Sequence, residues 1–347
     1  MTASPAEPLL RDLLQPLAPW LSDPATEEIA INRPGEVWVR QRGAFTRHAV
    51  ERDLDLIDCE SIAILAGALR QQDVGPEAPL LAAELPDGER LQACLVPVVP
   101  HGTISLTMRK PGADLVRLAA AAARYKTPDW KYTKEQRRSR RMAELLSLYD
   151  AGDLFAFLGA CVRAHLNILL TGKTGSGKTT FSKTLIAEID PAERLLTIED
   201  VPELVITQPN HVRLLFQRND RDEDIVKPEA LLQACLRMRP DRAIVGELRG
   251  PEAWVYAMEI MTGHPGSITT VHGSDAQSAF RRFFLLCKGH DDTAGLDSET
   301  LAHVLADTVD VIVPHFEDEG EFSISGVWFV ADAARRGGTA ADLLREG

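Results

Sequence analysis

Hydrophobic and polar positions divide this chain into a first part up to residue 110 and a second part from residue 151. Up to residue 110, short runs of strand-like residues stand beside one stretch with the apolar period of a helix. The runs predict a hairpin over 28–40, a helix over 58–71, and strands over 90–99 and 103–108. We therefore predict a small α+β domain over residues 1–110, without a catalytic constellation of its own.

Residues 1–22 place leucines at helical spacing, but Pro16 and Pro19 interrupt the run. The pattern predicts a broken helix that packs onto its own domain. A segment lying on a membrane is the alternative, and it is disfavoured because no lysine or arginine cluster lines the polar side.

From residue 151 onward, short apolar runs alternate with helix-like segments, which is typical of a mainly parallel α/β sheet. Ser274 and Gln277 have the spacing of a capping box and predict a helix through Cys287. The predicted strands cover 166–171, 194–198, 211–216, 243–246 and 267–271, and a terminal hairpin pairs 309–313 with 322–330 around the acidic turn 317–321.

Residues 111–150 separate the two parts and differ from both. They hold an alanine-rich helical stretch over 118–123 and the most basic run of the chain over 131–141. We interpret 111–150 as a partly helical linker and 151–347 as the second domain. The basic run is read as a solvated helix face. The alternative is an arginine that reaches a bound nucleotide or a neighbouring subunit.

Composition limits the class of protein. The 347 residues are 45% hydrophobic and 26% charged, as in ordinary globular proteins, and the formal charge is −13. That charge argues against a surface for non-specific nucleic-acid binding and against docking by bulk charge on anionic lipid. The five scattered cysteines lack a C-x-x-C motif and indicate neither a zinc site nor disulfides. No apolar run approaches the ~18 residues of a membrane span, so we expect a cytoplasmic protein.

The clearest motif is Gly-Lys-Thr-Gly-Ser-Gly-Lys-Thr over residues 172–179, which fits the phosphate-loop pattern G-x-x-x-x-G-K-[ST] between a strand and a helix. Backbone N–H groups of such a loop surround a polyphosphate at the positive end of the helix. Lys178 would reach the outer phosphates, and the Thr179 hydroxyl would bind Mg²⁺. The predicted nucleotide-binding residues in this segment are Thr174, Gly175, Ser176, Gly177, Lys178, Thr179 and Thr180.

Polar residues also follow three other predicted strands: Glu199 with Asp200, Glu247, and His272. Carboxyl ends of parallel strands meet at one edge, so we expect these side chains to converge on the loop. The predicted catalytic residues are Glu247, Glu199 and His272, and Glu247 would polarise the attacking water or hold Mg²⁺ through water. Gly246 stands where many such enzymes have aspartate. Either Thr179 and water therefore do more of the metal holding, or Glu199 or Asp200 helps. His272 would sense the γ-phosphate, although a lone histidine is often structural.

Four further residues are weaker candidates for the same site. His264 lies in a Gly-His-Pro-Gly turn, where a structural role is as plausible as a functional one. Arg249, Arg281 and Arg282 could pair with phosphate, but surface salt bridging is the better prediction for each.

The chain resembles the VirB11-type family of type IV secretion ATPases, within the secretion and pilus motor superfamily. After the phosphate loop, the resemblance rests on the ordered boxes 197–204, 239–249, 262–267 and 269–272, and in the first domain on 32–39 and 104–111. The family pattern itself lacks an aspartate before Glu247. By the same resemblance, Arg109 matches a first-domain arginine that approaches the nucleotide.

The resemblance implies a RecA-like P-loop NTPase domain with a mainly parallel sheet, preceded by the smaller α+β domain. It implies ATP and Mg²⁺ as cofactors and a homo-hexameric ring with ATP between two tiers of domains. It also implies a peripheral position at the cytoplasmic face of the inner membrane, beside membrane components of a type IV secretion system. The work would be secreted-substrate translocation and pilus assembly. In long-linker members the first domain can pack on a neighbour's second domain.

Four other functions remain open from the sequence alone. A type II secretion or pilus motor is the nearest, but we expect neither the longer amino-terminal region nor the four-cysteine metal site of many such motors. A RecA-like nucleic-acid motor should carry basic or aromatic loops, whereas this chain is acidic and 6% aromatic. A small-molecule kinase would need an arginine-rich lid, and a nucleotide-binding scaffold without turnover would require a misplaced Glu247.

Overall fold

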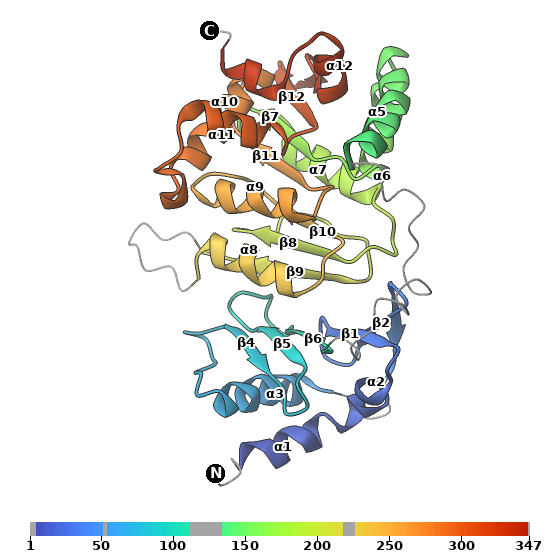
Figure 1. The fold of residues 1–347 in the computed structure, drawn as a ribbon, viewed down its shortest axis with the longest axis vertical. Helices are drawn as coiled ribbons and strands as arrows, with labels where there is room; N and C mark the ends of the chain where they lie inside the picture. Colours follow the sequence, from blue (N-terminus) through green and yellow to red (C-terminus); the bar gives the residue numbers. More distant parts are fainter. Residues whose placement is uncertain (1–4, 51–53, 112–133, 218–225, 346–347) are drawn as a thin grey trace, which may run out of the picture.

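The computed structural model describes residues 5–50, 54–111, 134–217 and 226–345. Two bodies stack along the long axis, with the first strands and helices at one end and the later elements at the other (Figure 1). Three hydrophobic clusters form the core. One lies within residues 10–108, one lies within residues 142–329, and the third joins Cys94, Val98 and Val99 of the first domain to the later elements.

The first domain is built on an antiparallel sheet with strand order β3-β2-β1-β6-β5-β4. Helix α3 (Leu56–Leu69) packs on this sheet, and α1 (Ala6–Leu13) packs against α3. The hairpin, the helix and the last two strands predicted from sequence are confirmed; β3 and β4 were not predicted. The strands are β1 (Thr26–Ile31), β2 (Val37–Gln41), β3 (Ala44–His48), β4 (Leu80–Glu84), β5 (Arg90–Cys94) and β6 (Ser105–Arg109).

The amino-terminal segment is a broken helix, as predicted. Helix α1 gives way to a 3₁₀ turn (Gln15–Leu17) that contains Pro16, and α2 (Ala18–Ser22) follows. Leu10, Leu14 and Leu17 are buried in the core of the first domain. The leucine run therefore stabilises its own domain.

The second domain has two parallel ladders, β10-β8-β9 and β11-β7-β12, with β13 and β14 antiparallel to β12. The backbone N–H of Leu248 donates to the Thr270 carbonyl at 3.0 Å and joins the two ladders. A mixed, mainly parallel α/β arrangement is thus confirmed. The strands are β7 (Ile168–Gly172), β8 (Leu195–Glu199), β9 (His211–Leu215), β10 (Arg242–Val245), β11 (Ile268–Val271), β12 (Val311–Asp318), β13 (Glu321–Ile324) and β14 (Trp328–Phe329).

Helices cover both faces of these strands. Successive strand residues enter different clusters: Ile168 and Leu170 pack with α6 and α7, whereas Leu169 packs with α9 and α10. Burial on both faces explains why these strands are continuously apolar. The helices are α6 (Leu154–Arg163), α7 (Lys178–Ala187), α8 (Pro228–Arg237), α9 (Glu252–Thr262), α10 (Ala276–Lys288), α11 (Ser298–Ala306) and α12 (Val330–Arg335).

Two predictions about the second domain were wrong in detail. The cap of α10 is Asp275, whose carboxylate accepts from Ser278 N at 2.7 Å, so the capping box lies one residue after the predicted one. Aspartate accepts these backbone bonds as a charged group, which favours it over the serine before it. The predicted strand 322–330 is divided into β13, β14 and the start of α12, and α11 was not predicted.

Part of the predicted linker packs with the second domain. Helix α5 (Lys134–Asp150) lies against α6 and α12, and Met142 and Leu145 are buried there. The Tyr149 hydroxyl donates to the Val327 carbonyl at 2.9 Å. Residues 112–133, which include the predicted helix 118–123, lie outside the described residues. For that stretch the linker therefore stays a prediction.

The two domains are joined by a buried polar cluster centred on Arg194. Its Nη1 donates to Asn32 of the first domain at 2.7 Å and to Asn210 at 2.5 Å, and its Nε donates to the Met238 carbonyl at 3.0 Å. The side chain is fully buried, and this burial lowers the pKa of Arg194 to about 10 while Glu28 opposes the shift. A buried cation is tolerated only with such partners, so Arg194 ties the first domain to the second.

The remaining predictions concern cysteines, membranes and metals. All five cysteines are free and buried, in agreement with the absence of a disulfide framework. In the described ranges, no helix is both long and apolar enough to cross a bilayer. The same residues hold no group of three histidine, cysteine or acidic side chains arranged for a metal.

Candidate functional site

The phosphate-loop segment has the predicted strand–loop–helix form. Strand β7 ends at Gly172, and α7 begins at Lys178 directly after Gly177, whose φ of +83° is the left-handed region that favours glycine. A Cβ on Gly172 would come within 2.3 Å of the Ser176 hydroxyl and 2.5 Å of the His315 carbonyl. Only glycine lets the loop fold this closely against β12.

Lys178 points back into the loop. Its buried ammonium donates to the carbonyls of Gly172 and Lys173, both at 2.7 Å. Burial lowers the pKa of Lys178, and the nearby Glu247 carboxylate opposes that shift. The buried hydroxyls of Thr171 and Ser176 have no hydrogen-bond partner in the described part of the chain.

Three of the strand-end residues form a connected group, as expected. Glu247 Oε1 lies 2.8 Å from His272 Nε2, and its Oε2 accepts from Arg249 Nε at 2.7 Å. Arg249 Nη1 in turn donates to Asp200 Oδ2 at 2.9 Å. The bond from Glu247 raises the pKa of Arg249. Arg249 forms salt bridges, as predicted, but its partners Glu247 and Asp200 belong to the site. The sequence did not predict that Arg249 joins these two carboxylates.

Glu199 is held differently from Glu247. Its carboxylate is buried and accepts from the Thr197 hydroxyl and from the backbone N–H of Leu204, both at 2.8 Å. Burial raises the pKa of Glu199, and the bond from Leu204 opposes the rise. These bonds give Glu199 a role in shaping the loop after β8, beside Asp200. Its predicted catalytic role remains a prediction.

Arg109 lies at the boundary between the domains. Its side chain is 64% exposed, and its Nε is 3.9 Å from Glu28 Oε1. It lines a cavity of about 530 Å³ together with Arg90 of β5 and Leu236 and Arg237 of α8. The structure therefore places Arg109 beside α8, and no residue of the phosphate loop lines this cavity.

His264 lies in the turn after α9 and is not part of this group. Burial lowers the pKa of His264, and its bond to the Glu259 carbonyl opposes that shift. These contacts therefore favour a structural role for His264.

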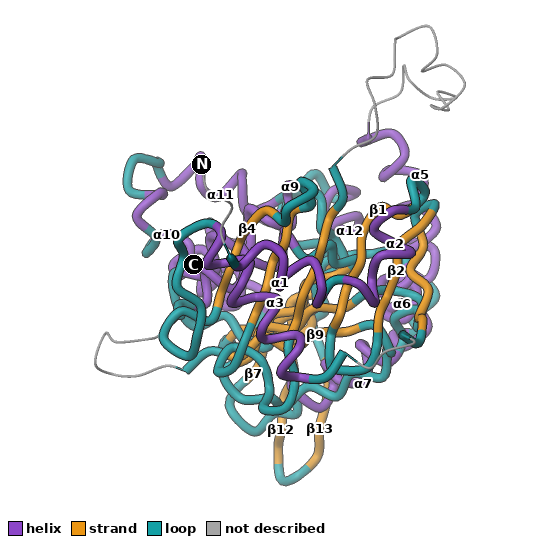
Figure 2. Tube along the Cα trace, turned by 90° about the horizontal axis from the view of Figure 1, so that it is seen from below, coloured by secondary structure: helices purple, strands orange, loops and turns teal. Residues whose placement is uncertain are grey.

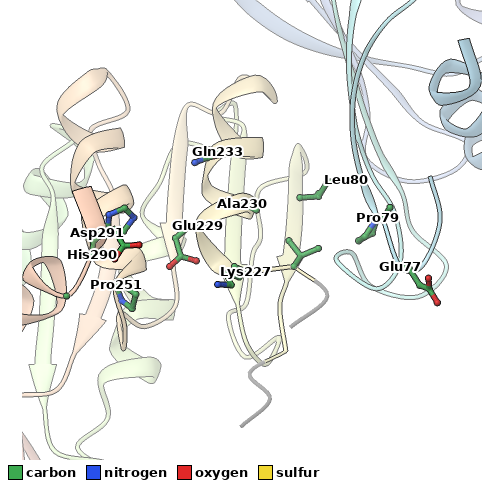
Figure 3. A pocket seen from close by; sticks show the side chains of 13 residues that line it. Glu77, Pro79, Leu80, Lys227, Glu229, Ala230, Gln233, Pro251, His290 and Asp291 are labelled. Carbon is green, nitrogen blue, oxygen red and sulfur yellow. The ribbon is translucent and has the colours of Figure 1, made fainter. Parts of the chain in front are cut away.

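A separate cavity of about 590 Å³ opens between the domains (Figure 3). Pro79 and Leu80 of the first domain face Glu229 and Ala230 of α8 across it, with His290 on the far side. None of the predicted site residues lines this cavity. We therefore assign the chemistry to the strand-end group around the phosphate loop.

His315 is a residue of the site region that sequence reasoning missed. It lies on β12 opposite Gly172, is 5% exposed, and its Nδ1 lies 2.9 Å from the Val313 carbonyl. Burial lowers the pKa of His315. No motif surrounds this histidine, so only the pairing of β12 with β7 reveals its position.

Comparison with known proteins agrees with this arrangement. The family model described as "Type II/IV secretion system protein" matches residues 135–319. Protein VirB11 of Agrobacterium fabrum is 52% identical over 98% of this chain and 99% of its own length. The type IV secretion system protein VirB11 of Bartonella quintana is 37% identical over 91% of each chain.

One solved structure is similar over nearly the whole fold. The crystal structure of the VirB11 ATPase from the Brucella suis type IV secretion system, in complex with sulphate, has a TM-score of 0.87 at 34% identity and 98% coverage of both chains. The fold and the site thus define a two-domain protein of the type II and type IV secretion class. Within that class, the chain belongs to the VirB11 family of type IV secretion ATPases.

Proposed function

We propose that this chain is a Mg²⁺-dependent ATPase whose loop 172–179 holds the nucleotide and whose turnover powers type IV secretion. The observation that carries the proposal is the position of Glu247. It is held between His272 and Arg249, at the edge of the sheet where Lys178 closes the phosphate loop. Family membership supplies the biological setting.

The residues divide the work by chemistry. Backbone N–H groups over 174–180 and the Lys178 ammonium stabilise the phosphates, with the start of α7 contributing its positive end. Glu247 orients the attacking water, because its carboxylate is kept in place by two partners. His272 senses the γ-phosphate. Glu199 keeps the loop after β8 in position.

The residues present suit Mg²⁺. This ion prefers oxygen ligands and usually keeps several waters beside one or two protein groups and the substrate phosphates. The Thr179 hydroxyl at the start of α7 is such a group, and the carboxylates of Asp200 and Glu247 stand at the same edge. Thr179 would hold the ion directly and the carboxylates through water. Bound there, Mg²⁺ neutralises charge on the outer phosphates.

Family membership and the exposed Arg109 support a proposal for the wider assembly. The second domain takes the RecA-like form, and six chains close a ring with ATP between the two tiers. Arg109 reaches the nucleotide of the ring, within its own chain after movement of the domains or in a neighbouring subunit. The ring lies at the cytoplasmic face of the inner membrane, with membrane components of the secretion system and the secreted substrate as partners.

Native mass measurement tests the ring. With ATP and Mg²⁺ present, we expect the mass of six copies of the 38.1 kDa chain. The Glu247→Gln variant serves as a control that keeps ATP bound. If both the wild type and Glu247→Gln remain strict monomers, with and without ATP and Mg²⁺, the ring motor is contradicted.

The Arg109→Ala variant tests the first domain's part in the site. We expect ATP turnover to fall about tenfold through loss of one charge-assisted hydrogen bond. The unfolding temperature should stay the same, because Arg109 is exposed and its ion pair is long. Arg47→Ala is the matched control, since Arg47 is also 64% exposed on the same sheet. Wild-type turnover in Arg109→Ala would remove this residue from the site.

A further inference from the structure

Two cavities follow one another along β4 of the first domain and α8 of the second. The cavity of about 590 Å³ is lined by Leu80 at the start of β4 and by Ala230 of α8 (Figure 3). The cavity of about 530 Å³ is lined by Glu84 at the end of β4 and by Arg237 at the end of α8. The ten residues of α8 span about 15 Å and the five residues of β4 about 17 Å, so the two walls have similar lengths. We call this pair of cavities the β4–α8 groove.

Strand β4 is the last strand of the first-domain sheet and pairs with β5 alone among the described strands. The backbone N–H of Leu85 donates to the Glu89 carbonyl at 2.8 Å, which makes these two residues a bonded pair directly after β4. Bonded and non-bonded pairs alternate in an antiparallel ladder, so the backbone groups of Leu80, Ala82 and Glu84 point away from β5. Within the described ranges, these three residues form no other backbone hydrogen bond. The edge therefore offers a row of N–H and C=O groups to a further strand.

The sequence of β4 does not block this edge. Natural edge strands are usually protected by lysine, proline or a bulge. Leu80–Glu84 contains neither lysine nor proline, and its register with β5 is regular. Strand β4 lies on the opposite side of the sheet from β2 (Figure 2). Leu81 belongs to the core of the first domain, whereas Leu80 packs on the cluster that includes α8, so alternate side chains of an added strand would face α8.

The end of the groove at the start of β4 is acidic. Glu77, Glu229 and Asp291 line it, and Lys227 is the one lysine or arginine among the described lining residues. Glu229 Oε2 is buried and has no hydrogen-bond partner in the described part of the chain. A buried carboxylate oxygen is costly to leave unpaired, so this end is suited to a basic side chain.

The end of the groove at the end of β4 is basic. Arg70, Arg90, Arg109 and Arg237 line it. Glu84 is the one carboxylate among the described residues around this cavity, and it already accepts from Arg70 Nη2 at 2.6 Å. Arg90 lies on β5 and Arg237 on α8, so cations stand on both walls. The groove therefore changes from negative to positive in the direction of β4.

We infer that the β4–α8 groove binds an extended segment of a partner protein, which adds a strand to the edge of β4. Backbone pairing requires a ligand with N–H and C=O groups of its own, so the ligand is a polypeptide. The charges require a basic residue at the end beside Glu229 and an acidic residue at the end beside Arg237. About five residues of extended chain match the length of β4. This binding role goes beyond ATP hydrolysis and does not depend on it.

Selection from a phage library of random heptapeptides, with the full-length protein as bait, tests the inference. We expect the enriched peptides to carry lysine or arginine near one end and aspartate or glutamate near the other. Fluorescence anisotropy of one enriched peptide, synthesised with a label, then gives its dissociation constant. In Ala82→Pro we expect this constant to rise about tenfold, because proline removes the outward N–H and the backbone bond that it donates. Ala82→Ser keeps the N–H and is the matched control, which should bind the peptide like the wild type.

Exchange of charges tests which end of the groove takes which residue. Glu77 is exposed, so Glu77→Lys should raise the dissociation constant about threefold, as expected for an exposed ion pair. Replacing the basic residue of the peptide by glutamate should restore binding to Glu77→Lys and weaken binding to the wild type. A disturbance of the fold in Glu77→Lys would not be rescued by the peptide. Unfolding temperatures show whether both variants are folded.

Three results would overturn the inference. One is a library from which no sequence is enriched. Another is wild-type affinity for the peptide in both Ala82→Pro and Glu77→Lys. The third is a second copy of this chain as the occupant of the groove. Peptide binding would then weaken as the protein concentration rises, and the native mass of Ala82→Pro would be smaller than that of the wild type.

Discussion

The Glu247→Gln variant is expected to bind ATP like the wild type and to lose about 10²- to 10⁴-fold in turnover, the usual contribution of a positioned acid–base group. Glutamine keeps the shape of the side chain but cannot accept a proton from water. The neutral glutamine amide can still contact His272 and Arg249, so the edge of the sheet should keep its arrangement. Steady-state phosphate release, together with ATP titration, separates turnover from binding.

Glu203→Gln is the control for this change. Glu203 is an exposed carboxylate of the same acidic box and adds its negative charge to the field at Arg249. Its neutralisation changes the charge of that edge equally, and turnover should stay within about twofold because surface charge effects are small. Undiminished turnover in Glu247→Gln would remove Glu247 as the catalytic residue.

The Lys178→Ala variant is expected to lose nucleotide affinity itself, by about 10- to 100-fold, because charged hydrogen bonds to phosphate are worth about 1.5–3 kcal/mol. In the structure the ammonium is buried and held by the Gly172 and Lys173 carbonyls. It can exchange these neutral acceptors for phosphate oxygens, which are charged. Isothermal titration with ATP measures the loss.

Lys173→Ala is the matched control, since Lys173 is an exposed lysine of the same loop. It should bind ATP nearly as the wild type does. In Lys178→Ala the two loop carbonyls lose their hydrogen-bond donor. The unfolding temperature of this variant shows whether that loss destabilises α7. Unchanged ATP affinity in a folded Lys178→Ala variant would contradict the phosphate-loop assignment.

Local patterns predicted the parts of the site that depend on neighbours in sequence. The loop 172–179 carries its strand and helix beside it, and Glu247 and His272 follow short apolar runs. Parallel strands bring such ends together, so their contact could be expected. In the first domain, the strands Ala44–His48 and Leu80–Glu84 were missed because they are more exposed than the neighbouring strands and lack their continuous buried runs.

Other features depend on pairings between distant segments, and no local pattern reports them. His315 joins the site only because β12 lies beside β7. Arg194 reads as the start of an ordinary strand, yet it is fully buried by Asn32 and Asn210. Arginine is seldom buried without such partners, and those partners come from both domains. The cap of α10 was misplaced because serine and aspartate at adjacent positions both match the pattern.

The most direct test of the account is a single-turnover experiment with protein in excess over ATP and Mg²⁺. After rapid quenching, the nucleotide on the protein is separated and identified as ATP or ADP. Our account predicts that the wild type converts bound ATP to ADP and phosphate, whereas Glu247→Gln retains it as intact ATP. Conversion of bound ATP by Glu247→Gln at the wild-type rate would contradict the claim that Glu247 activates the attacking water.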